Sequence, residues 1–232
     1  KSFWLGKEGK RPVALKPVVH REGPATFEVV YPRTPEEVHR GTVHLAKATC
    51  LVCNSTLPAD RVRTQLRDQG GGADPVLDAQ AKRISGATLL AVVTSRTGTK
   101  GRKYREPTRR DWEAVSAAHA EHIKLLGRGK PGNTVFPDQP ISTPLGREFR
   151  IGDPYYNFTP VLNYGITRWS QLFTKRQLVG LAEMSGLILS SASQRPPLAR
   201  LLAMSFDRVL MSDMSLTRWN PSGEKMQHTF GR

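Results

Sequence analysis

The stretch Ala48-Thr49-Cys50-Leu51-Val52-Cys53-Asn54 carries the clearest local signal, because it places two cysteines three positions apart. A Cys-x-x-Cys turn brings two thiolates to one side of a tight bend, where each can reach a tetrahedral zinc ion at about 2.3 Å. The residue after the second cysteine needs a left-handed backbone, which glycine adopts freely and asparagine tolerates, and Asn54 stands there. Cys50 and Cys53 are therefore candidate ligands in one half of a zinc site.

Two other interpretations of this cysteine pair stay open. A thioredoxin-like redox pair has the same spacing but is expected before a helix, whereas Ser55-Thr56-Leu57-Pro58 reads as turn or strand. Two structural cysteines without a ligand are also compatible with the sequence, since the chain contains no second pair. We favour zinc, because the chemistry of the turn agrees with it.

Several histidines are possible further ligands, and none is singled out by spacing. Three of them, His20, His39 and His44, lie nearest to the cysteines. Two others, His119 and His122, share one face of an expected helix, where a polar surface explains them without a metal.

The residues around the cysteine pair, 1–70, read as short strands and turns. Alternating or β-branched runs bounded by Pro and Gly predict strands at 2–5, 13–19, 26–31 and 42–46. These residues are expected to form an all-β, zinc-ribbon-like module. The glycines at 70–72 then break the chain.

The middle of the chain, residues 71–158, is expected to be mixed. The sequence predicts a short helix at 78–84, a buried strand at 88–94, a basic loop, and a helix from Thr108 to about Leu126 that Thr108 and Asp111 begin. Residues 127–158 are rich in Pro, Gly and Asp and read as a long irregular connection.

Residues 159–232 are expected to form a helical module. Thr174 and Gln177 are spaced as a capping box, and Pro196-Pro197 opens a further helix. One apolar face of the second helix is lined by Leu198, Leu201, Leu202, Ser205, Phe206 and Val209. The two helices are predicted to pack as an antiparallel pair. The predicted fold class is α+β, a small antiparallel β module followed by a mostly helical one.

The charge of the chain points to an acidic partner. With 35 Lys and Arg against 20 Asp and Glu, the formal net charge is +15 and nucleic acid is the first candidate. One basic run has a single acid, Glu106, beside it, and its candidate phosphate-binding residues are Arg96, Lys100, Arg102, Lys103, Arg105, Arg109 and Arg110. A solvated loop that only aids solubility explains the run almost equally well. Tyr104 and Trp112 are possible base-stacking residues, although Trp112 is better explained as core.

No active site is visible from the residues themselves. The run Gly127–Gly132 matches a dinucleotide motif in letters but follows a helix, and Asp153-Pro154-Tyr155-Tyr156 lacks the second proline of an Asp-Pro-Pro-Tyr motif. The longest uncharged stretch, 154–167, is shorter than the roughly 20 apolar residues of a membrane span. We expect a cytoplasmic segment excised from a longer chain, without a membrane partner.

Taken together, a series of short motifs resembles the large adenine-specific DNA methylases that contain a Zn-ribbon. In order, these motifs are Phe3-Trp4-Leu5, Val13-Ala14-Leu15-Lys16-Pro17, Gly41-Thr42-Val43, Ala48 to Cys53, Leu90 to Val93, Gly101 to Thr108, Tyr164-Gly165, Trp169, Leu172 to Leu178, Ser215 to Trp219 and His228 to Arg232. Their order and spacing cover nearly the whole chain. Leu51 and Asn54 depart from the family, which usually has Pro and Gly there.

The resemblance implies a parent enzyme that transfers a methyl group from S-adenosylmethionine to the N6 amine of adenine in double-stranded DNA. It also implies a second Cys-x-x-Cys upstream of Phe3, a cofactor motif further upstream and an Asp-Pro-Pro-Tyr motif downstream. This segment would contact DNA, hold half of the zinc site, assemble with the rest of the parent chain and contain no catalytic or cofactor-binding residue. The alternatives are a non-enzymatic basic nucleic-acid-binding zinc-ribbon module and a scaffold for an acidic protein.

Overall fold

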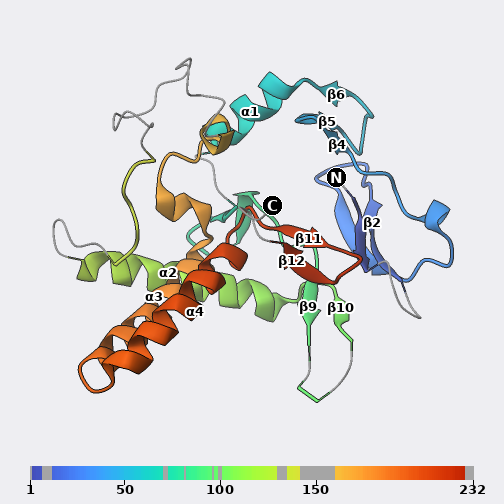
Figure 1. Ribbon diagram of the computed structural model, residues 1–232. Helices are drawn as coiled ribbons and strands as arrows, with labels where there is room; N and C mark the ends of the chain where they lie inside the picture. Colours follow the sequence, from blue (N-terminus) through green and yellow to red (C-terminus); the bar gives the residue numbers. More distant parts are fainter. Residues whose placement is uncertain are drawn as a thin grey trace. The chain divides into compact units, whose positions relative to one another are not determined.

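The computed structural model describes residues 2–6, 12–69, 73–80, 82–95, 97–98, 101–129, 135–141 and 160–227. These residues form small antiparallel sheets, mostly near the N-terminus, and helices that dominate the C-terminal part (Figure 1). The α+β fold class is therefore confirmed. No helix in the described part of the chain is long and apolar enough to span a membrane.

The chain divides into two compact units, each assembled from separate segments. Unit 1 comprises Lys1–Gln65, Thr88–Asp111 and Trp219–Met226, and unit 2 comprises Leu66–Ala87, Trp112–Arg218 and Gln227–Arg232. The consecutive division at 1–70, 71–158 and 159–232 stays a prediction about domains.

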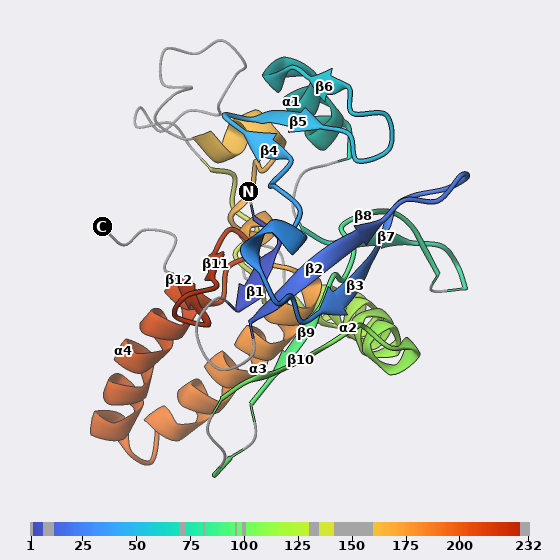
Figure 2. The same ribbon diagram turned by 90° about the vertical axis from the view of Figure 1, so that its right-hand side faces the viewer.

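The N-terminal strands of unit 1 lie close to their predicted positions. Strands β1 (Trp4–Gly6), β2 (Val13–Val18) and β3 (Thr26–Val30) form an antiparallel sheet in that order (Figure 2). Val13, Ala14 and Leu15 of β2 are buried and supply most of the core of this unit. A second small sheet consists of β4 (Val43–His44), β5 (Lys47–Thr49) and β6 (Thr56–Leu57), so that the two cysteines fall in the turn between β5 and β6.

The expectation that residues 1–70 contain only strands and turns is wrong. Helix α1 (Ala59–Asp68) follows Pro58, and its first turn is held by a hydrogen bond from the Val62 amide to the Pro58 carbonyl, 3.1 Å. Asp60 in the first turn and Arg67 in the last complement the helix dipole. This run lacks the period-two alternation of a strand, and its arginines and glutamine are good helix formers.

Two further hairpins belong largely to unit 1. Strands β9 (Val92–Thr94) and β10 (Lys103–Arg105) pair antiparallel, and β11 (Arg218–Asn220) pairs with β12 (Lys225–Gln227). The strand is thus shorter than the buried strand predicted at 88–94, and it is only half-buried. Leu90, which lies ahead of it in the chain, is exposed.

In unit 2, the short helix predicted at 78–84 is wrong. Strands β7 (Pro75–Leu77) and β8 (Arg83–Gly86) pair antiparallel across this region. The Asp78 carboxylate accepts hydrogen bonds from the Gln80 and Lys82 amides, 3.0 and 2.8 Å. Asp78 therefore fixes a side-chain-capped turn, which competes with helix in such residues.

Helices α2 (Arg109–Arg128) and α3 (Lys175–Ala192) begin where the sequence predicts. Thr108 donates hydrogen bonds from both its amide and its hydroxyl to the Asp111 carboxylate, 2.7 Å each. Thr174 and Gln177 form the expected reciprocal capping box. The core of unit 2 lies beside α3 and is formed by Phe136, Ile141, Leu162, Ile166, Leu172, Phe173, Leu178 and Leu181.

Helix α4 (Pro196–Ser212) pairs with α3 as predicted (Figure 1). Ala199 is buried, and Phe206 and Leu210 pack on the core. Of the six residues predicted to line one face of this helix, Phe206 packs on the described core, and the leucines at 198, 201 and 202 are exposed. Residues 70–72, most of 127–158 (including Asp153 to Tyr156) and 228–232 lie outside the described part of the chain.

Candidate metal half-site and nucleic-acid interface

The turn from Cys50 to Ser55 is closed by backbone hydrogen bonds at both ends. The Asn54 amide donates to the Cys50 carbonyl at 3.0 Å, and the Cys50 amide donates to the Ser55 carbonyl at 2.9 Å. Asn54 has a φ of 56°, in the left-handed region. The prediction that a left-handed residue follows the second cysteine is therefore confirmed.

Hydrogen-bond donors of the turn lie close to both sulfurs. The Val52 amide points at Cys50 Sγ, 3.4 Å away. The pKa of the Cys53 thiol is lowered from its usual value, mainly by hydrogen bonding to the Ser55 side chain and backbone and to Cys50. Because zinc binds the deprotonated form, a turn that lowers a thiol pKa is suited to the metal. Both cysteines are free thiols, and Cys53 is exposed.

These two residues fit one half of a zinc site, and the described residues do not supply the other half. No group of three or more His, Cys, Asp or Glu suited to a metal occurs among them. Two nearby histidines have other partners: His20 Nε2 lies 2.8 Å from Thr26 Oγ1, and His39 Nδ1 lies 2.6 Å from the Arg40 carbonyl oxygen. A closed tetrahedral site needs two more ligands.

The basic run contains a strand rather than a continuous flexible loop. Within β10, Lys103 and Arg105 are exposed on one face while Tyr104, between them, is only 7% exposed. The Tyr104 hydroxyl donates a hydrogen bond to the Leu5 carbonyl, 3.3 Å. Tyr104 therefore anchors the hairpin, and the suggestion that it stacks on bases is wrong because its ring is buried.

One of the seven candidate cations is held in an ion pair. Arg105 binds both carboxylate oxygens of Asp111, at 2.6 and 2.8 Å. This guanidinium, together with Thr108, holds the pKa of Asp111 far below its usual range. Glu106 is therefore not the only acid near the run, since Asp111 lies six residues after Arg105 and pairs with it.

The other candidates differ in what surrounds them. Arg102 is exposed, with its guanidinium carbon 6.0 Å from the centre of the Trp219 ring. Lys103, Arg109 and Arg110 are exposed as well. Arg96 and Lys100 lie outside the described residues.

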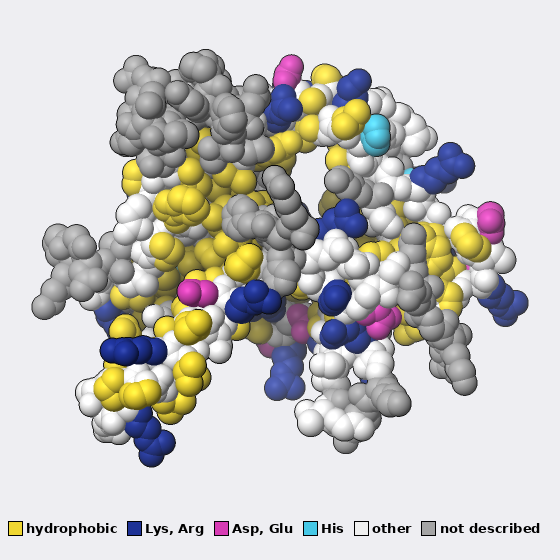
Figure 3. Space-filling model, viewed as in Figure 1, with side chains coloured by type: hydrophobic (Ala, Val, Ile, Leu, Met, Phe, Trp, Pro, Cys, Tyr) yellow, Lys and Arg dark blue, Asp and Glu magenta, His cyan; other side chains and the backbone are white. Residues whose placement is uncertain are grey.

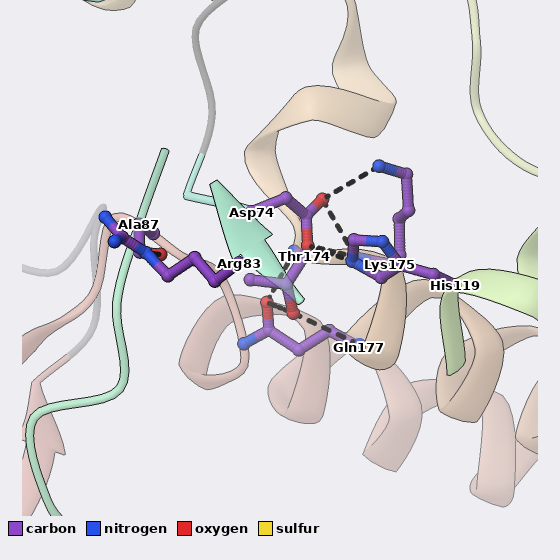
Figure 4. Close-up of polar contacts among 7 residues, drawn as sticks. All are labelled: Asp74, Arg83, Ala87, His119, Thr174, Lys175 and Gln177. Atoms are coloured by element: carbon purple, nitrogen blue, oxygen red, sulfur yellow. Dashed lines mark hydrogen bonds and ion pairs between the residues drawn. The ribbon is translucent and has the colours of Figure 1, made fainter. Parts of the chain in front are cut away.

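A polar cluster in unit 2 was not found from the sequence. Both carboxylate oxygens of Asp74 accept a hydrogen bond from the Lys175 amide at 3.1 Å, and Lys175 Nζ lies 3.9 Å from Asp74 Oδ2 (Figure 4). His119 Nε2 lies 3.4 Å from Asp74 Oδ1. Asp74 thus connects the start of β7 to the N-terminus of α3 and to α2. No local sequence pattern around Asp74 predicts these contacts. The capping box at Thr174 does mark the N-terminus of α3, to which Asp74 binds.

A cavity of about 460 Å³ opens beside this cluster. His119 and His122 line it with Asp74, Ser170, Gln171 and Lys175. Burial and the Lys175 charge lower the pKa of both imidazoles, more than Asp74 raises it. The His122 ring stacks on Phe136 with the ring centres 4.6 Å apart. The lowered pKa values favour the neutral form of both imidazoles, which pack beside Asp74 and Phe136.

No family model matches the chain, and no curated protein and no solved structure matches it either.

Proposed function

We propose that this chain is the DNA-contacting, target-recognition segment of an S-adenosylmethionine-dependent adenine-N6 DNA methyltransferase. In this proposal Cys50 and Cys53 hold one half of a structural zinc site, and the basic hairpin of β9 and β10 contacts DNA phosphates. The single observation that carries the proposal is the turn at the two cysteines. The resemblance implies a pair of zinc ligands at this point in the order of motifs.

Three features of that turn support zinc. Asn54 takes the left-handed conformation, the Val52 amide is directed at Cys50 Sγ, and Ser55 lowers the pKa of Cys53. A redox pair is less well supported, since β6 and not a helix follows the turn directly. Zinc would fix the turn and so stabilise the small sheet of β4, β5 and β6.

The hairpin supports contact with nucleic acid. Its strand β10 is anchored through Tyr104 and turns Lys103 outward, and Arg102 and Arg110 are exposed nearby in the sequence. Such cations bind phosphates and position a duplex without reading its sequence. The net charge of +15 favours the same partner.

Methyl transfer itself would belong to the parent enzyme. The resemblance assigns the cofactor motif and the catalytic Asp-Pro-Pro-Tyr motif to flanking sequence, where an adenine flipped out of the duplex would be methylated. The segment alone is expected to bind DNA and to be inactive as a methyltransferase.

Elemental analysis of zinc tests the proposal. We expect stoichiometric zinc in a longer piece of the gene product that includes the upstream cysteine pair, and loss of that zinc in Cys50→Ser and Cys53→Ser. The matched control is Ser85→Ala in β8, which changes an exposed serine outside the cysteine turn and keeps both sulfurs. A longer piece without zinc, or zinc that survives both substitutions, would contradict the proposal.

A second candidate is a non-enzymatic nucleic-acid-binding module. The exposed cations favour it equally, because phosphate contact needs no catalytic residues. The flanking gene sequence separates the two functions: only the methyltransferase requires an Asp-Pro-Pro-Tyr motif downstream.

A further inference from the structure

Helix α4 exposes its most regular apolar face. Leu198, Leu201, Leu202 and Val209 recur at three-, four- and seven-residue steps, with Ser205 completing the row. All of them are exposed, and Leu201 is 63% exposed. We call these five residues the α4 stripe. Residues at this spacing lie along one side of a helix.

Among the described residues, the core of unit 2 does not include the α4 stripe, and its large side chains stay partly in water, from 37% exposed at Val209 to 63% at Leu201. In α4, Ala199 is buried and Phe206 and Leu210 pack on the core, and the helical period centres these three on another side of the helix. A soluble domain rarely leaves such a row of large apolar side chains in water without a binding role. Figure 3 shows apolar side chains over the hairpin of α3 and α4, with both basic and acidic side chains beside them.

The charges next to the α4 stripe are basic. Arg208 follows Leu201 by seven residues, which is about two helical turns, so it lies along the Leu201 edge of the stripe. Arg195 precedes Leu198 by three residues and lies at the other end. Asp207 is the acidic residue within α4, and the helical period places it on the side opposite the stripe. No ion pair within the described part of the chain joins Arg195 or Arg208 to a carboxylate.

We propose that the α4 stripe docks an acidic amphipathic helix of a partner protein. The apolar side of such a helix would pack on Leu198, Leu201 and Leu202, in the way that amphipathic helices bind apolar grooves. Its flanking carboxylates would pair with Arg195 and Arg208. A second copy of this chain is a poorer occupant, because it would bring the same arginines and a further net charge of +15 to the interface.

The test uses the 232-residue chain and two synthetic helical peptides that share a leucine stripe. One peptide has glutamates flanking the stripe and the other has lysines. In a fluorescence anisotropy titration, we expect the glutamate peptide to bind at least about tenfold more tightly than the lysine peptide. Leu201→Glu should weaken that binding by about tenfold or more, since it places a charge where the bound peptide would bury a leucine.

Two further variants make the result specific. Ile84→Glu is the matched control, because Ile84 in β8 is 62% exposed and lies outside the stripe; it should bind the glutamate peptide like the wild type. Arg208→Glu should lower affinity for the glutamate peptide and raise it for the lysine peptide. Circular dichroism melts establish that each variant is folded.

Several results would overturn the proposal. These are failure of the glutamate peptide to bind, equal binding of the two peptides, and no effect of Leu201→Glu in a folded protein. Binding to phosphatidylserine vesicles that Leu201→Glu abolishes, with no peptide binding, would assign the stripe to a lipid surface instead. A dimer in sedimentation equilibrium that Leu201→Glu dissociates would assign it to a second copy.

Discussion

The Trp219 indole nitrogen donates a hydrogen bond to the main-chain carbonyl of Leu5, 2.6 Å away and 214 residues earlier in the chain. The Tyr104 hydroxyl donates to the same carbonyl at 3.3 Å. One backbone oxygen of β1 therefore joins the first strand, the basic hairpin and the C-terminal hairpin of unit 1. Contacts between such distant segments explain why unit 1 is discontinuous in sequence.

Replacing Trp219 by Phe should destabilise unit 1. The substitution removes the shorter of the two hydrogen bonds to Leu5 and part of the packed ring, and the lost hydrogen bond alone is worth about 1 kcal/mol of unfolding free energy. Urea denaturation measures the effect. Tyr104→Phe is the comparison, which removes the longer bond and should cost less. Equal stability of Trp219→Phe and the wild type would contradict this role for the indole.

The ion pair between Arg105 and Asp111 should make the start of α2 sensitive to acid. Because the folded state lowers the pKa of Asp111, its contribution to stability is present above the pKa of the unfolded carboxyl, near 4, and is lost as pH falls below that value. Asp111→Asn should therefore have a lower melting temperature than the wild type at pH 7. The difference between the two proteins should be smaller at pH 3. A difference that stays constant over this range would show that the charge of Asp111 is not responsible.

The cavity histidines should make unit 2 less stable in mild acid. Burial first, and then the Lys175 charge, lowers the pKa of His119 and His122 in the folded state, while Asp74 opposes this. The unfolded chain then binds protons more readily, so stability is full above about pH 6.5 and falls as pH drops below it. Unfolding of the wild type and of His119→Gln between pH 8 and pH 5 measures this. The variant should lose less stability on acidification, and parallel curves for the two proteins would refute the assignment.

Local sequence signals predicted the features that a few neighbouring residues determine. The start of α2 at Thr108, the capping box at Thr174 and the left-handed Asn54 all depend on contacts within about four residues. The predictions that failed concern places where two local structures compete or where residues far apart in the sequence make contact. Asp78 closes a hairpin turn where the sequence analysis predicted a short helix at 78–84.

The face of α4 and the role of Asp74 show a second limit. Periodicity locates an apolar stripe on α4 but cannot tell whether this chain or a partner covers it, and the fold uses Ala199, Phe206 and Leu210 instead. Asp74 acts on Lys175, 101 residues away, so no local pattern marks it. The cysteine turn was identifiable because its chemistry is contained in six residues.

Binding of duplex DNA by the 232-residue chain over a range of salt concentrations tests the central claim most directly. We expect the logarithm of the affinity to fall linearly with the logarithm of the salt concentration, and Lys103→Gln to make the slope shallower by about one unit, the loss of about one phosphate contact. Lys124→Gln, on α2 and paired with Glu121, is the matched control and should leave the slope unchanged. No binding at low salt, or a slope that Lys103→Gln does not alter, would contradict the account of the basic hairpin as a DNA-contacting element.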